Sequence, residues 1–161
     1  MDNTQEKDDE LFKLKFKLWS GEIVYRKVEK KICFVSEILK NLINDCNSSN
    51  NEDIPIFIEC FTNDKQIDIL LDLMKYLSTP ESDNFKYDVK NTKSYLYTNK
   101  DIDNYLIDTN VYDYQALFII TNFLDIEPLM DYFSIIIANS IKKNYLLSKY
   151  KVNFAMINDN N

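Results

Sequence analysis

The strongest constraint on the fold is an alternation near the start of the chain. Between Phe12 and Leu18, apolar residues alternate strictly with lysines, and a period of two is typical of a β-strand with one buried face. Gly21, the only glycine of the 161 residues, follows in Ser20-Gly21-Glu22, where a tight turn requires positive φ. A second strand begins at Ile23, so we predict a β-hairpin. The lysines are interpreted as a solvent face or a protected sheet edge rather than a ligand site.

The rest of the chain is mainly helical in its spacing. Residues 36–43 repeat apolar side chains at three and four positions, after Ser36 as the N-cap. Residues 67–77 form a clear amphipathic pattern, and residues 113–124 follow a cap at Asp113. A last helix is predicted to open at residues 125–128, where carboxylates and Pro128 suit a first turn.

Two further segments complete the predicted fold. Residues 54–58 indicate a short strand, placed at an edge or a strand start by Pro55. Residues 79–105 are polar, with scattered aromatics, and predict a long loop. The expected class is α+β, a small three-stranded sheet capped by helices. We predict a disordered segment at 1–10, one domain at 11–144 and a shortened C-terminal segment at 145–161.

Composition excludes several functions. The chain has no histidine, so nucleophile–histidine pairs and histidine metal sites are impossible, and one glycine is too few for phosphate-binding loops. Cys33, Cys46 and Cys60 contain no C-x-x-C pair. We therefore expect no enzyme activity, cofactor or metal.

Charge and hydropathy restrict the partners and the location. A net charge of −7 argues against nucleic acid. The longest apolar runs, such as residues 135–138, are far shorter than the roughly 20 residues of a membrane helix. The polar first residues and unpaired cysteines indicate reduced thiols in the cytoplasm or nucleus.

Several strings, in order, resemble the S-phase kinase-associated protein (Skp) family within the BTB/POZ fold. Ser20-Gly21-Glu22 is similar to the family's "SDGE" turn, and residues 35–39 lie where the family has "TIKxML". Residues 54–56 are similar to its "VPLP" strand, and residues 67–77 to its next helix. The most specific match is NFLDIEPLMD, residues 122–131, against "NYLDIKxLLD"; ANSIK, residues 138–142, matches "ANMIK". The resemblance covers residues 12–144 and implies a BTB/POZ-like fold.

The resemblance also implies a function. Skp proteins are adaptors that connect a cullin N-terminal domain to an F-box substrate receptor in a ubiquitin ligase of the SCF type. By position, the cullin-binding residues would be Ile38, Leu39, Asn122 and Phe123. Phe123 replaces the family tyrosine and, from its spacing, could instead belong to the core. Asn122 could equally be a local helix cap.

The F-box surface would lie on the last helix and the tail. Its candidates are Tyr132, Ile136, Ile141, Leu147, Tyr150 and Phe154, of which Ile136 and Ile141 could pack internally instead. The family string "TPEEI" is replaced here by Asn144-Tyr145-Leu146-Leu147. The alternative to a bridging adaptor is therefore a homodimeric BTB/POZ scaffold, or a one-sided decoy that binds a cullin or an F-box without joining them.

Overall fold

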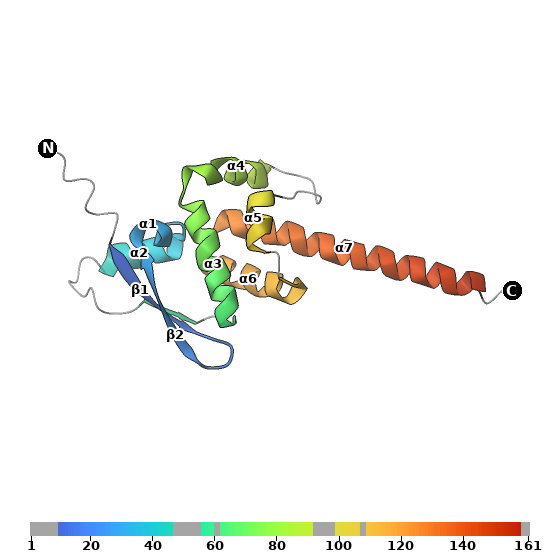
Figure 1. Ribbon diagram of the computed structural model, residues 1–161, viewed down its shortest axis with the longest axis horizontal. Coiled ribbons are helices and arrows are strands. Elements are labelled where there is room, and N and C mark those ends of the chain that lie inside the picture. The colour runs from blue at the N-terminus through green and yellow to red at the C-terminus, as the bar shows by residue number, and fades with distance from the viewer. Residues whose placement is uncertain (1–9, 47–55, 60–61, 92–98, 107–108, 159–161) are drawn as a thin grey trace.

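The computed structural model describes residues 10–46, 56–59, 62–91, 99–106 and 109–158, with side chains as far as Lys143 in the last helix. In chain order (Figure 1) the elements are β1 (Leu11–Lys17), β2 (Ile23–Glu29), α1 (Lys30–Cys33), α2 (Glu37–Cys46), β3 (Ile56–Glu59), α3 (Asp64–Leu77), the 3₁₀ turn η1 (Pro80–Ser82), α4 (Asp83–Asn91), α5 (Lys100–Tyr105), α6 (Val111–Phe123) and α7 (Glu127–Asn158). A three-stranded sheet with a larger helical part confirms the predicted α+β class.

The sheet has the order β2-β1-β3. Strands β1 and β2 pair antiparallel, and β1 pairs parallel with β3. The predicted hairpin is confirmed: Gly21 has φ of 84°, and its N–H donates to the Leu18 carbonyl over 2.9 Å. Strand β3 contains part of the predicted 54–58 strand, whose first two residues lie outside the described part.

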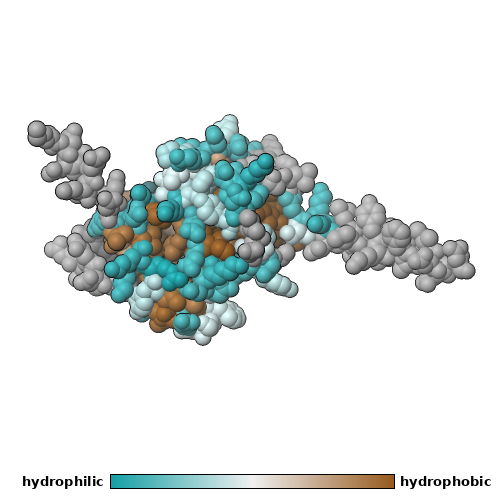
Figure 2. All heavy atoms as spheres, viewed as in Figure 1, coloured by the Kyte–Doolittle hydropathy of each residue, from teal (hydrophilic) through white to brown (hydrophobic). Residues whose placement is uncertain are grey.

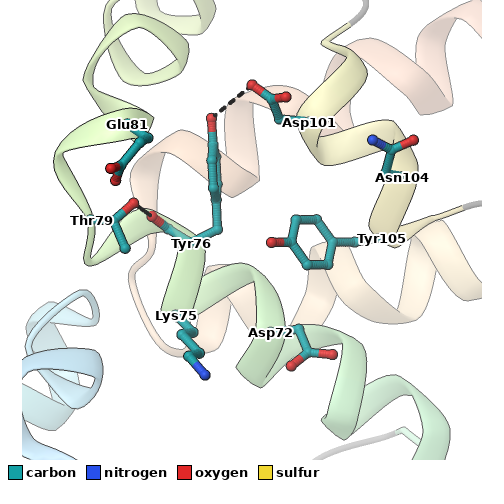
Figure 3. Close-up of a pocket in the computed structure, with 8 residues that line it drawn as sticks. All are labelled: Asp72, Lys75, Tyr76, Thr79, Glu81, Asp101, Asn104 and Tyr105. Atoms are coloured by element: carbon teal, nitrogen blue, oxygen red, sulfur yellow. Dashed lines mark hydrogen bonds between the residues drawn. The ribbon is translucent and has the colours of Figure 1, made fainter.

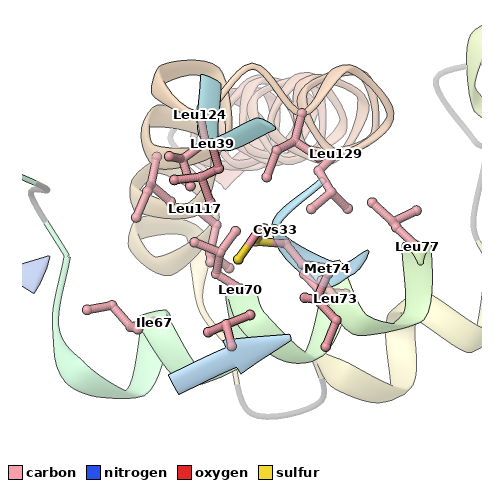
Figure 4. Packing of buried hydrophobic residues seen from close by; sticks show 14 of the residues in the cluster. Cys33, Leu39, Ile67, Leu70, Leu73, Met74, Leu77, Leu117, Leu124 and Leu129 are labelled. Atoms are coloured by element: carbon pink, nitrogen blue, oxygen red, sulfur yellow. The ribbon is translucent and has the colours of Figure 1, made fainter. Parts of the chain in front are cut away.

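The core lies between the inner face of the sheet and the helices. Leu14 and Phe16 of β1 are fully buried against it, as the alternation predicted. Helix α3 crosses the middle of the body, and Figure 4 shows its side chains among those of α1, α2, α6 and α7. The labelled side chains are Cys33, Leu39, Ile67, Leu70, Leu73, Met74, Leu77, Leu117, Leu124 and Leu129.

Reciprocal caps begin helices α3 and α6. The Gln66 N–H donates to the Asn63 side chain and the Asn63 N–H donates back to Gln66 Oε1, each over 2.9 Å. Asn110 and Asp113 make the same exchange at α6. The predicted cap at Asp113 is therefore wrong by three residues, because Asn110 is the cap and Asp113 is its helical partner. Gln66 Nε2 also donates to Asp113 Oδ1 over 2.6 Å, which joins the starts of the two helices.

The long loop predicted at 79–105 is wrong for most of its length. The segment forms η1, α4 and α5, and its residues 92–98 lie outside the described part of the chain. Each helix is polar except for a few buried side chains, Phe85 and Val89 in α4 and Ile102 in α5. The Phe85 ring meets the Tyr132 ring edge-on, with centroids 5.5 Å apart. These contacts with distant residues, rather than local periodicity, stabilise the two helices.

The turn between α6 and α7 is a Schellman motif. The Ile126 N–H donates to the Thr121 carbonyl over 3.0 Å, and the Asp125 N–H donates to the Asn122 carbonyl over 3.2 Å. Asp125 adopts the left-handed conformation, with φ of 53°. Helix α7 then runs along the body and extends well beyond it (Figure 1). The boundary predicted at residue 144 falls inside this helix.

Candidate protein-binding surfaces

The start of α2 is fixed to the end of α6. Ser36 Oγ donates to the Leu124 carbonyl over 2.5 Å and accepts from the Leu39 N–H over 3.1 Å. The second bond confirms Ser36 as the N-cap of α2. The Glu37 N–H donates to the Asp125 carbonyl over 3.4 Å. Carbonyls that the α6 terminus leaves without helical partners are thus satisfied by the first residues of α2.

This junction places apolar side chains of both helices at the surface. Ile38 and Leu42 are exposed on α2, while Ile119 and Phe123 are about half exposed on α6, at 50% and 52%. Asn122 lies beside Phe123 and is also exposed. These five residues are called the α2/α6 surface. Each apolar pair is spaced by four residues and therefore shares one side of its helix.

Helix α6 is apolar on both sides. Leu117, Ile120 and Leu124 are buried in the core, while Ile119 and Phe123 face outward. A helix that is apolar all round is normally covered all round. Exposed apolar side chains that gather on a surface mark sites of protein association, and Figure 2 shows hydrophobic patches on a largely hydrophilic face of the molecule. The outward side of α6 is therefore suited to a protein partner.

Three of the four residues predicted for cullin binding lie on this surface. Ile38, Asn122 and Phe123 are exposed, so Phe123 is not a core residue. Leu39 is wrong as a contact residue because its side chain is fully buried. It occupies the third helical position of α2 and packs near Leu124 (Figure 4).

Leu42 and Ile119 are not among the residues that the resemblance implies for this surface. The apolar pattern predicted at residues 36–43 includes Leu42, but this pattern is wider than the buried face of α2, and Leu42 is 40% exposed. Ile119 lies four residues before Phe123, so the same spacing that grouped Ile38 with Leu42 could have indicated it.

The predicted F-box residues all lie on α7, in different settings. Tyr132 is wrong as a surface residue: it is fully buried, and its hydroxyl donates to Asp103 Oδ1. Burial, followed by that carboxylate, raises the pKa of the Tyr132 phenol. Ile136 is half-buried against the core and Ile141 is 64% exposed. The side chains of Leu147, Tyr150 and Phe154 lie outside the described ones.

A shallow pocket of about 720 Å³ lies between the end of α3, η1 and α5 (Figure 3). Tyr76 and Tyr105 face it with ring centroids 6.1 Å apart, and the Tyr76 hydroxyl donates to Asp101 Oδ2 over 3.5 Å. Asp72, Glu81 and Asp101 line it, and all three are exposed.

The described part of the chain contains no group of three metal-ligating side chains. Among the same residues, no helix is both long and apolar enough to cross a membrane. No protein-family model and no curated protein sequence matches the chain.

Proposed function

We propose that the chain is a non-enzymatic adaptor of the Skp kind, which bridges a cullin N-terminal domain to an F-box substrate receptor in a ubiquitin ligase. The observation that carries this proposal is the α2/α6 surface. It joins residues 38–42 of α2 to residues 119–123 of α6, and the resemblance to the family selected residues of both segments. The order of hairpin, α2, β3 and α3 follows the order of the strings that resemble the family.

Phe123 is the expected anchor of the cullin interface. It is the largest side chain of the surface, and about half of it remains to be buried by a partner. Apolar burial contributes about 1.5–3 kcal/mol for a complete large side chain, and aromatic anchors often dominate an interface. Neighbouring Asn122 offers hydrogen-bonding groups at the rim of the same contact.

The F-box receptor would bind along α7. This helix leaves the body, and its last turns receive no support from the sheet or from α3 (Figure 1). Ile141 is 64% exposed on this helix, and an amphipathic partner helix could bind there. The further candidates Leu147, Tyr150 and Phe154 follow it in the chain. The adaptor would contribute to the ligase by holding the substrate receptor close to the cullin, and it would need no catalytic group of its own.

The proposed cullin-binding site can be tested by introducing positive charge into it. The double variant Asn122→Lys, Phe123→Lys should lose at least about a hundredfold in affinity for a cullin N-terminal domain, which is about 2.7 kcal/mol. Tyr87→Lys is the matched control, because Tyr87 is 70% exposed on α4, away from the surface. If the folded double variant bound the cullin with unchanged affinity, Asn122 and Phe123 would not be part of the cullin-binding site.

The receptor site can be tested by truncation. A chain ending at Lys143 should keep cullin binding and lose F-box binding, because the body and the α2/α6 surface are retained. F-box binding by the shortened chain would show that the F-box-binding site does not lie on residues 144–161. Light scattering tests the alternative scaffold: a stable homodimer that the Phe123→Lys change dissociates would contradict the bridging role.

A further inference from the structure

The outer face of the sheet, on the side away from the core, is rich in lysine. The strand register places one row of Ile23, Lys17 and Glu59 across the sheet, and a second row of Tyr25, Lys15 and Phe57. Lys27 lies opposite Lys13 in the next row. We call Lys13, Lys15, Lys27, Tyr25 and Phe57 the lysine face.

The lysines of this face are not neutralised by the described residues. Lys17 forms an ion pair with Glu59 over 2.8 Å. In contrast, Lys13, Lys15 and Lys27 have no carboxylate partner in the described ranges. Arg26 points to the inner side, where Asp64 and Asp68 bind it. A positive face on a chain of net charge −7 is therefore a local feature.

The arrangement works against stability. Like charges directly opposite each other on neighbouring strands are destabilising, and Lys13 and Lys27 form such a pair. Two ammonium groups instead lie over aromatic rings, with Lys13 Nζ 4.7 Å from the Tyr25 centroid and Lys15 Nζ 5.3 Å from the Phe57 centroid. Both rings remain about half exposed, at 47% and 50%.

We propose that the lysine face binds an extended, acidic segment of a partner protein. Lys13 and Lys15 are two residues apart on one strand, a separation of about 7 Å. An extended peptide presents every second side chain at the same interval, so alternate carboxylates can meet both ammonium groups. Lys27 adds a third positive charge beside Lys13. The exposed edges of Tyr25 and Phe57 can cover the apolar parts of the segment.

Charge favours a peptide over a nucleic acid. A long polyphosphate would be repelled by the rest of an acidic chain, whereas a short acidic segment meets only the positive face. The rings of Tyr25 and Phe57 are also covered on one side by lysine ammonium groups, which leaves less of each ring for base stacking. This inference does not depend on the adaptor function.

The test uses the full chain and a fluorescein-labelled peptide of twelve residues that alternates glutamate with threonine. The matched neutral peptide replaces glutamate with glutamine, and an oligothymidylate of equal length is the nucleic-acid probe. The variant is Lys27→Glu. Its control is Lys100→Glu, at an exposed position of α5; each change alters the net charge by two, from −7 to −9.

Fluorescence anisotropy should show saturable binding of the glutamate peptide alone, weakening as salt rises from about 50 to about 200 mM. Lys27→Glu should weaken binding about fivefold and raise the melting temperature, since the new carboxylate would face Lys13 across the strands. Lys100→Glu should leave the affinity near that of the natural chain. Absence of glutamate-peptide binding, equal losses in the two variants, or tighter oligothymidylate binding would each overturn the proposal.

Discussion

Replacing Ser36 with alanine tests how the two helices of the α2/α6 surface are held together. The Ser36 hydroxyl is buried, accepts from the Leu39 N–H and donates to the Leu124 carbonyl. Loss of an N-cap costs about 1 kcal/mol, and a buried carbonyl left without a donor costs about 1–3 kcal/mol. Ser36→Ala should therefore lower the free energy of unfolding by about 2–4 kcal/mol.

The assay is urea denaturation followed by circular dichroism. With a slope of about 2 kcal/mol per molar urea, the midpoint should fall by about 1–2 M with the slope unchanged. Ser134→Ala is the control: Ser134 Oγ also donates to a main-chain carbonyl, that of Met130, but at an exposed position inside α7. It should change stability by less than about 0.5 kcal/mol. Equal midpoints for the two variants would refute the role assigned to Ser36.

Three further substitutions test a buried hydroxyl, the turn between α6 and α7, and a buried thiol. Tyr132→Phe keeps the ring but leaves the Asp103 carboxylate without the hydroxyl that donates to it. Calorimetry should therefore show a free energy of unfolding lower by about 1–2 kcal/mol. An unchanged value would contradict the buried position of the Tyr132 hydroxyl. Asp125 has φ of 53°, so Asp125→Val should lower the free energy of unfolding by about 1–2 kcal/mol. Asp125→Gly should leave it unchanged. Equal effects of the two substitutions would contradict the left-handed conformation at this turn. Burial raises the pKa of the Cys33 thiol from 9.0 to about 12, so its contribution to stability is complete below pH 9 and falls as the unfolded thiol ionises above it. Stability measured at rising pH should therefore decline more steeply for the natural chain than for Cys33→Ala; parallel declines would contradict the burial of this thiol.

Local patterns predicted the elements whose stability is local. The alternation before Gly21 predicted β1 and the hairpin, because the period of two directly reports one buried face. The Ser36 cap was predicted correctly since the bond to Leu39 spans only three residues. Helices α4 and α5 were not predicted, because their burial depends on contacts such as Phe85 with Tyr132, which lie far apart in the chain.

The candidate surface shows the same limit. The resemblance selected both Ile38 and Leu39 of α2 and did not separate the exposed side chain from the buried one. Neighbouring Ile38 and Leu39 differ in exposure because Ser36 fixes the rotation of α2 against α6. Tyr132 is buried against Asp103 of α5, which lies in a segment predicted to be a loop, so the spacing within α7 could not indicate its burial.

The adaptor role is tested most directly by mixing the purified chain with a cullin N-terminal domain and an F-box segment, separately and together, and measuring the mass of each complex by light scattering. We expect two binary complexes and a ternary complex that contains one copy of each partner. The cullin and the F-box should not associate without the chain. Binding to only one partner, or to neither, would contradict the bridging function.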